Sequence, residues 1–262
     1  MPLPIPDKGR VLFAEDCITT PTADKVARAY DLTLYPQVGN SDAAVLEVYT
    51  RLQFTYVNGT ATDGSTLTWM PAEKKVYARK FCDAVLAVWN NRHVIKDTSG
   101  NAQWKEIAVV FDMDYWIDSV VSTRHWELQV KKVDQFSVSF IAQTKNSGVM
   151  DNQDVDMTVK IGATPTTPAV SQRPAAHEFG HCLGLNDEYV TSGGWHNPHY
   201  TWDADSVLHS GEEVRERHYA PFADWLTRQL EYSGANRLLR KNGYSTIKYK
   251  VNGTTDLTTA KL

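Results

Sequence analysis

Residues 175–189 read AAHEFGHCLGLNDEY, and this stretch is the part of the sequence from which fold and chemistry can be inferred. Its apolar residues predict a helix over about 174–184, on which His177 and His181 lie on one face because they are four residues apart. Two imidazoles on one helical face can bind the same zinc ion. Glu178 directly follows the first histidine, where it can reach a zinc-bound water as general base. The pattern therefore predicts a catalytic zinc site.

The pattern continues to Gly184 and Asp187. His-Glu-x-x-His-x-x-Gly-x-x-Asp resembles the motif of metzincin-type zinc peptidases in their aspartate-ligand variant. The resemblance implies that Gly184 turns the chain out of the helix, since glycine tolerates a positive φ, and that Asp187 reaches the metal as third ligand. Metzincins also carry a methionine in a turn beneath the zinc, whereas no methionine follows residue 157. Leu208 stands at the corresponding place and can fill the same apolar space.

A second resemblance covers residues 45–230. The segments 177–189 and 205–226, with shorter matches at 89–93 and 124–126, are similar to metallopeptidase toxin domains of bacterial contractile injection systems, including those fused to type VI secretion spike proteins. This implies a protein made in the cytoplasm without a signal peptide, exported by such a system, and active in a target-cell periplasm or a host cell. It also implies a protein or peptide substrate, an immunity protein and a secretion-spike component as partners.

Two carboxylates compete for the place of third ligand. Asp187 has the metzincin spacing, although carboxylates also orient ligating histidines without touching the metal. Glu213 is the rival, because in the other large zinc-peptidase layout a glutamate from a second helix completes the site; Ser210 and Glu213 also fit a capping box. His218 and Tyr219 are candidates for oxyanion stabilisation or substrate contact, with a structural role at the start of a helix as the alternative.

The periodicity of apolar residues predicts an α+β (mixed α/β) fold with a twisted mixed sheet, an active-site helix and a C-terminal helix. Residues 1–42 are expected to be irregular, 43–243 to form a zincin-like metallopeptidase domain, and 244–262 to form a tail. The predicted strands lie at 46–56, 107–111, 126–130, 136–140 and 155–161, and the predicted helices begin at Pro71 and span about 174–184 and 211–230.

Composition excludes several classes of protein. Of 262 residues, 42% are hydrophobic and 22% charged, which is typical of a globular protein and excludes a disordered or coiled-coil chain. The net charge of -4 argues against nucleic-acid binding. No apolar stretch approaches the roughly 18 residues of a membrane span, and the first residues lack the apolar core of a secretory signal. The three cysteines contain no Cys-x-x-Cys pair, so a disulfide framework is not expected.

The leading hypothesis is a zinc endopeptidase in which Glu178 moves protons between water, peptide and leaving amine. One alternative is a zinc amidase acting on cell-wall peptides, which the toxin resemblance also allows. Another is a non-catalytic binding protein stabilised by zinc. A structural zinc site usually favours cysteine ligands, and Cys182 is expected to face away from the histidines as a buried thiol.

Overall fold

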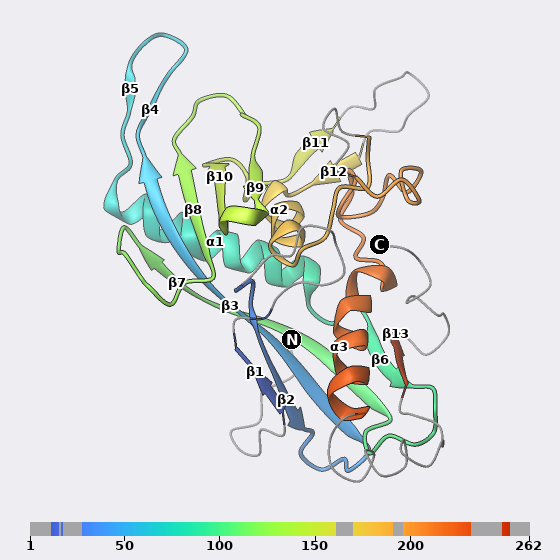
Figure 1. Ribbon diagram of the computed structural model, residues 1–262. Helices are drawn as coiled ribbons and strands as arrows, with labels where there is room; N and C mark the ends of the chain where they lie inside the picture. Colours follow the sequence, from blue (N-terminus) through green and yellow to red (C-terminus); the bar gives the residue numbers. More distant parts are fainter. Residues whose placement is uncertain are drawn as a thin grey trace.

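The computed structural model describes residues 12–15, 17, 28–160, 170–190, 196–231 and 248–251. These residues form a nine-stranded mixed sheet, two small two-stranded sheets and three α-helices, which confirms the predicted α+β class (Figure 1). The main sheet contains β1 (Leu12–Ala14), β2 (Asp31–Pro36), β3 (Ala43–Val57), β6 (Val94–Asp97), β7 (Glu106–Ile117), β8 (Trp126–Lys131), β9 (Phe140–Ala142), β10 (Ser147–Asp151) and β13 (Tyr249–Val251). The small sheets pair β4 (Gly59–Thr60) with β5 (Thr66–Leu67) and β11 (Thr158–Lys160) with β12 (Val170–Gln172).

The long strand β3 organises the main sheet. It pairs in parallel with β7 along one edge, and its other edge is shared by antiparallel β2 and parallel β8. The alternation that predicted a strand at 46–56 lies wholly within β3, and its side chains Leu46, Val48, Leu52 and Phe54 are buried. Beyond β8 the sheet continues through β10 to β9, the last strand in the order β13-β6-β7-β3-β8-β10-β9.

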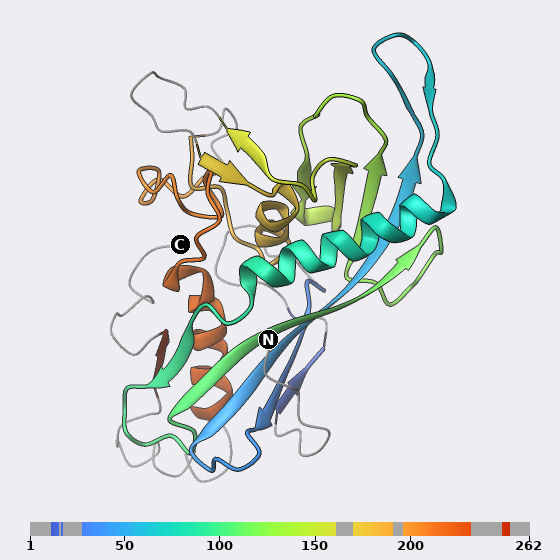
Figure 2. The ribbon, with the colours of Figure 1, turned by 180° about the vertical axis from the view of Figure 1, so that it is seen from behind.

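The helix α1 (Pro71–Trp89) begins at Pro71, as predicted, and runs across the strands of the sheet (Figure 2). Its apolar face is buried in the core, including Phe81 and Val85. The indole Nε1 of Trp89 donates a hydrogen bond of 2.9 Å to the carbonyl of Ala176 in the helix α2 (Pro174–Cys182). The end of α1 therefore fixes the position of α2, which carries both histidines of the motif.

Residues 1–42 are not irregular throughout, because β1 and β2 join the main sheet. The predicted tail likewise contributes β13, which pairs with β6 and buries Tyr249. The hydroxyl of Tyr249 donates to the carbonyl of Trp104. Short strands of this kind are held by pairing with distant partners, which the local pattern does not reveal. The remaining parts of 1–42 and 244–262 lie outside the described residues.

The late helix begins later than predicted. A 3-10 turn, η2 (Glu216–Tyr219), leads into α3 (Ala220–Glu231), in which Phe222, Leu226 and Leu230 are buried as expected. Residues 211–215 are instead folded back on the chain before them, since Gly211 N donates to Ser206 O and Glu213 N donates to Asp205 O. A side chain at Gly211 would collide with the Asp205 backbone.

Two predicted strands are shorter than expected. The run 155–161 gives only β11, because residues 152–156 form turns after β10. In these turns Gln153 N donates to the side chain of Asp151. Residue 161 lies outside the described part. The run 136–140 gives only the start of β9. In this run Ser137 and Ser139 face inward, which is the reverse of a strand that buries its apolar side chains.

Candidate metal centre

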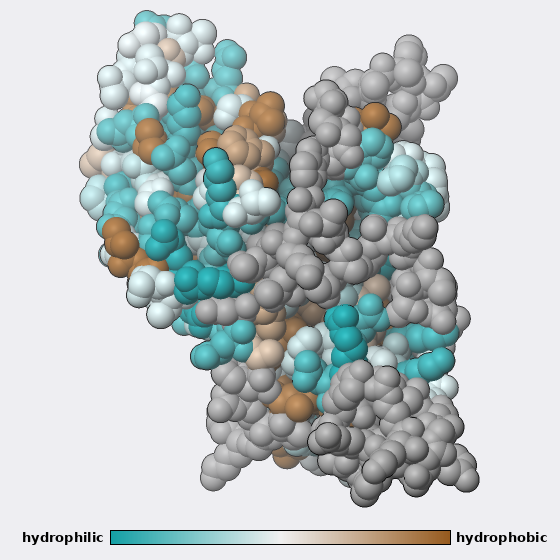
Figure 3. All heavy atoms as spheres, viewed as in Figure 1, coloured by the Kyte–Doolittle hydropathy of each residue, from teal (hydrophilic) through white to brown (hydrophobic). Residues whose placement is uncertain are grey.

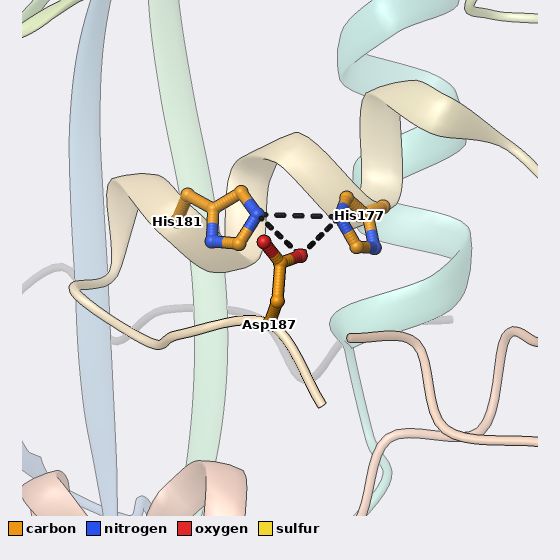
Figure 4. Close-up of side chains that lie close together, drawn as sticks. All are labelled: His177, His181 and Asp187. Atoms are coloured by element: carbon orange, nitrogen blue, oxygen red, sulfur yellow. Dashed lines mark hydrogen bonds and ion pairs between the residues drawn. The ribbon is translucent and has the colours of Figure 1, made fainter. Parts of the chain in front are cut away.

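Three side chains converge at α2. His177 and His181 project from one face of the helix, with their Nε2 atoms 3.2 Å apart. Asp187, from the segment that follows the helix, places Oδ1 3.2 Å from Nε2 of His177 and 3.3 Å from Nε2 of His181 (Figure 4). These three side chains form a group that can hold a metal ion, and it is the one found among the His, Cys, Asp and Glu side chains of the described residues.

A sharp turn brings Asp187 back to the histidines. Gly184 has φ +85°, a conformation that glycine adopts without the steric cost that a side chain would add. Leu185 N donates to Gly180 O, which closes the turn at the end of the helix. Asn197 N donates a hydrogen bond of 2.6 Å to the carbonyl of Asp187 and so fixes the main chain there. The role expected for Gly184 is thereby confirmed.

Backbone carbonyls orient both imidazoles. Nδ1 of His177 donates to Val207 O and Nδ1 of His181 donates to Leu185 O, each over 2.8 Å. Because a carbonyl only accepts, each Nδ1 must carry a hydrogen, which leaves Nε2 as the free nitrogen of the neutral ring. Such hydrogen bonds are typical of histidines that bind metals.

Two glutamine side chains support these carbonyls. Gln172, at the end of β12, donates to Val207 O over 2.8 Å. Gln143, in the 3-10 turn η1 (Gln143–Lys145) after β9, donates to Leu185 O over 3.0 Å and to His181 O over 3.1 Å. No sequence pattern singled out either glutamine, because each acts on backbone from a distant segment.

The arrangement fits a cation. Two imidazole lone pairs and a carboxylate oxygen face one another at 3.2 to 3.3 Å, and such electron-rich atoms repel unless a positive charge lies among them. Oδ1 of Asp187 is buried and makes no conventional hydrogen bond within the described residues. Two nitrogen ligands and one oxygen ligand from three side chains can therefore hold a metal ion.

The pKa shifts of His181 and Asp187 also indicate that positive charge is stabilised in the cluster. Burial acts to lower the pKa of His181, but the contact with Asp187 and the nearby charge of Glu178 raise it to about 9. Burial acts to raise the pKa of Asp187, but the two imidazoles hold it well below its usual range. A proton and a metal ion compete for the same atoms, so acid weakens metal binding.

Glu178 lies in the cavity beside this cluster. Its side chain is buried, and within the described residues Oε2 has no hydrogen-bond partner. A cavity of about 590 Å³ is lined by Glu178, His181, Asp187 and Tyr189, with residues 138–141, 143 and 144 forming another wall. A buried carboxylate oxygen without a partner is costly in a purely structural position, and it is suited to receive a proton from a bound molecule.

Leu208 occupies the space beneath the site helix. The side chain is buried, and its Cδ2 lies so close to Gly180 that a Cβ there would approach it to 2.5 Å. Leu208 O accepts a hydrogen bond from Glu188 N, while the preceding residue supplies the carbonyl that orients His177. The leucine thus fills apolar space against α2, as the sequence predicted for the position of the missing methionine.

Glu213 is separated from the histidines. Its side chain is exposed and lines another hollow, together with Asp205 and Arg215. The predicted capping box is absent because the α-helix begins only at Ala220. Of the two competing carboxylates, the structure brings Asp187 to the histidines and leaves Glu213 outside the group.

His218 and Tyr219 are packed inside the protein and do not line the cavity. The hydroxyl of Tyr219 donates to Trp89 O, and Nδ1 of His218 accepts a hydrogen bond from Arg215 N. Their positions favour the structural alternative over the oxyanion or substrate role considered from the sequence. Histidine and tyrosine occur both in buried packing positions and in cavity walls, so the local sequence could not tell which of the two applies here.

Tyr189, which the sequence interpretation passed over, does line the cavity. Its ring stacks on that of His177, with centroids 6.0 Å apart and planes at 26°. Burial, followed by the charge of Asp187, raises the pKa of the phenol, so the hydroxyl keeps its proton and is a hydrogen-bond donor at neutral pH. The only feature of the sequence that could have indicated this place in the cavity is that Tyr189 lies two residues after Asp187.

No protein-family model matches the chain, and a search of curated proteins finds no match. Within the part of the chain that the structure describes, no helix combines the length and apolar character required to cross a membrane.

Cys182 is buried in the core, as expected, and burial raises the pKa of its thiol.

Proposed function

We propose that this protein is a zinc-dependent metallopeptidase. The observation that carries the proposal is the combination, in one cavity, of a His177–His181–Asp187 group and the buried, unpartnered Oε2 of Glu178. A group of metal ligands alone is compatible with a structural site. A carboxylate beside it, with one buried oxygen that contacts no described donor, can act as the general base that hydrolysis requires.

Zinc is the metal that the donor set favours. Two imidazoles and one carboxylate from three residues match a catalytic zinc site, which keeps a further position for water or substrate. Hard oxygen-rich sites, by contrast, favour magnesium and calcium. The described surroundings of the group contain no cysteine ligand that would close it as a structural site, since Cys182 is buried in the core.

A bound zinc ion supplies Lewis-acid chemistry, activating water and polarising a carbonyl oxygen. Glu178 takes a proton from the attacking water and passes it to the departing amine. The hydroxyl of Tyr189, on the wall of the same cavity, donates a hydrogen bond to the carbonyl oxygen as it gains negative charge. Val207 and Leu185 keep the imidazoles in the tautomer that presents Nε2.

The biological setting belongs to the same proposal. We infer a toxin or effector of a contractile, type VI-like secretion system, with an immunity protein and a spike component as partners and a target-cell periplasm or host cell as its place of action. The resemblance of segments 177–189 and 205–226 to such toxin domains is what suggests this setting. A zinc amidase acting on cell-wall peptides has the same site chemistry. The buried Oε2 of Glu178, which has no partner among the described residues, argues against a non-catalytic, zinc-stabilised binding protein.

The experiment compares zinc-loaded wild type with Glu178→Gln and with the double variant His177→Ala/His181→Ala. Wild type should bind about one zinc per chain and cut unfolded protein substrates. Glu178→Gln should retain zinc and lose activity by 10² or more, on the order expected for a general base. The double variant should lose both. Retention of zinc by the double variant, or full activity of Glu178→Gln, would contradict the proposal.

The same variants test the biological setting. Wild type directed to the periplasm of a susceptible bacterium should slow growth, while Glu178→Gln should not. Assays on purified cell-wall peptides and on unfolded proteins, run side by side, separate an amidase from a protein-directed peptidase. Equal toxicity of wild type and Glu178→Gln would mean that the harm does not arise from this site.

A further inference from the structure

The segment that leads into β9 carries its apolar side chains on the outside. Phe136, Val138 and Phe140 are 45%, 82% and 52% exposed. The residues between them, Ser137 and Ser139, face inward, which is the reverse of an ordinary half-buried strand. Figure 3 shows hydrophobic side chains at the surface over the connection between β8 and β9. Side chains two apart on an extended segment share one face, so the three form a row, here called the apolar ridge.

Buried carboxylates lock this orientation. Ser137 donates from N and Oγ to Oδ2 of Asp151, over 2.8 and 3.1 Å, and Ser139 Oγ donates to Oδ2 of Asp154 over 2.6 Å. Both aspartates are fully buried. Turning the segment over by one residue would hide the apolar side chains but would remove the serine donors from two buried carboxylates, which is costly. The outward position of the apolar ridge is therefore built into the fold.

The apolar ridge is continuous with the metal centre. Val138 and Phe140 line the same cavity as Glu178 and His181. The strand β9 lies at the end of the sheet, where it pairs with β10. The segment is also connected to the site helix through Asp154. The side chain of Asp154 accepts a hydrogen bond from Ser139, and its main-chain carbonyl accepts one from Ala175 N at the start of α2. A chain lying along the apolar ridge therefore reaches the catalytic residues.

We propose that the apolar ridge binds the polypeptide substrate and selects sequences with apolar side chains two residues apart beside the cleaved bond. The proposal rests on the proposed peptidase function and adds its substrate class. Exposed apolar side chains at a sheet edge favour aggregation, so their retention beside the cavity fits a binding role. A second copy of the chain seated there would cover the cavity, which favours a substrate as the occupant.

The first measurement is binding, which does not depend on turnover. Zinc-loaded Glu178→Gln is titrated into a labelled peptide that alternates leucine and serine, and into the same peptide with threonine replacing each leucine. The leucine peptide should bind at least about tenfold more tightly, the scale of discrimination by apolar contacts. Adding Val138→Thr, which preserves side-chain shape, or Phe140→Thr should remove most of this preference. Val120→Thr is the matched control, since Val120 is 91% exposed and does not line the cavity.

The second measurement is cleavage. A proteome-derived peptide mixture is digested by zinc-loaded wild type, Val138→Thr and Val120→Thr, and the residues around each cut are identified by mass spectrometry. Wild type and Val120→Thr should show apolar residues at two positions two apart, and Val138→Thr should flatten this preference. Thermal unfolding of each variant checks that it is folded.

The outcomes separate the two proposals. Cleavage without apolar preference, or a preference unchanged in Val138→Thr, overturns the inference and leaves the peptidase function standing. Selective binding without any cleavage by wild type overturns the function and leaves the apolar ridge as a peptide-binding surface. Absence of both binding and cleavage overturns both. Dimers of wild type that dissociate in Val138→Thr, measured by light scattering, would show that a second copy occupies the apolar ridge and would also overturn the inference.

Discussion

Glu188 and Arg217 are joined by two contacts of 2.6 Å, from Nε to Oε1 and from Nη2 to Oε2. Both side chains are largely buried, and Arg217 also contacts Asp203 and stacks on the ring of Tyr200 at 4.1 Å. Burial acts to raise the pKa of Glu188, but Arg217 and the neighbouring histidine lower it to about 2. Because Glu188 directly follows Asp187, this ion pair ties the candidate metal ligand to η2.

The variant Arg217→Met should therefore weaken both folding and metal binding. It removes the Arg217 contacts from two buried carboxylates, Glu188 and Asp203, which costs about 3 kcal/mol in the free energy of unfolding. Metal affinity should fall about 10- to 100-fold, as for other residues that position ligands. Urea unfolding of the metal-free protein and competition with a chelating dye measure the two effects.

The control is Lys80→Met, which breaks an exposed pair with Asp156. Here the free energy of unfolding should change by less than about 1 kcal/mol. Unaltered metal affinity in Arg217→Met would contradict the positioning role.

Asp187→Ala and Glu213→Ala should have opposite outcomes. Asp187 supplies an oxygen 3.2 Å from His177 Nε2, so its loss removes one of three ligands and should abolish tight metal binding. Glu213 is exposed outside the group, so its loss should leave the affinity unchanged. Isothermal titration of the metal-free proteins with zinc distinguishes them. The reverse pattern would mean that the second-helix arrangement forms in solution.

Tyr189→Phe should affect turnover more than binding. The variant retains the ring that stacks on His177 but loses the hydroxyl, so zinc affinity should stay within about threefold of wild type while kcat falls by about 10²-fold, the scale for one lost oxyanion donor. KM should change little. Steady-state kinetics on a single fluorogenic peptide provide both constants, and an unchanged kcat would exclude the hydroxyl from the reaction.

Asp154 should make stability depend on pH. Burial, together with the charge of Asp151, raises its pKa to about 7, although Ser139 opposes the shift. Because the folded pKa lies above the unfolded one, the favourable contribution is complete below about pH 4 and is lost as pH rises through 7. The loss is on the order of 4 kcal/mol.

The measurement is urea unfolding of wild type and Asp154→Asn between pH 4 and 8, with a chelator present so that metal occupancy stays constant. The neutral variant lacks this loss, so its stability relative to wild type should increase across that range. Asp156→Asn serves as control, because Asp156 is largely exposed. A difference between wild type and Asp154→Asn that stays constant with pH would contradict the prediction.

The parts of the fold that were predictable are those with strong local patterns. The alternation within β3 and the apolar face of α1 specify a strand and a helix without reference to the rest of the chain. The paired histidines specify one face of α2 by spacing alone. Each of these features needs only neighbouring residues, and each lies where it was expected.

The remaining features depend on distant contacts. Around Ser137 and Ser139 the sequence shows the alternation of a strand but not which face is buried. The serines face inward because hydrogen bonds to buried carboxylates outweigh the burial of the apolar side chains. The delayed start of the last helix follows from the fold-back of Gly211 onto Ser206. The glutamines at 143 and 172 act on carbonyls far away in sequence, so no motif could identify them.

The hydrogen bonds from the two imidazoles to Val207 O and Leu185 O have a consequence for how such a site changes over time. A carbonyl group is present whatever side chain its residue carries. Substitutions at these two positions can therefore alter packing and even the surrounding cavity while the rings keep their hydrogen-bond acceptors. The orientation of the two imidazoles therefore depends on the path of the main chain and not on which side chains residues 185 and 207 carry. The residues that line the cavity can change while the orientation of the ligands stays the same.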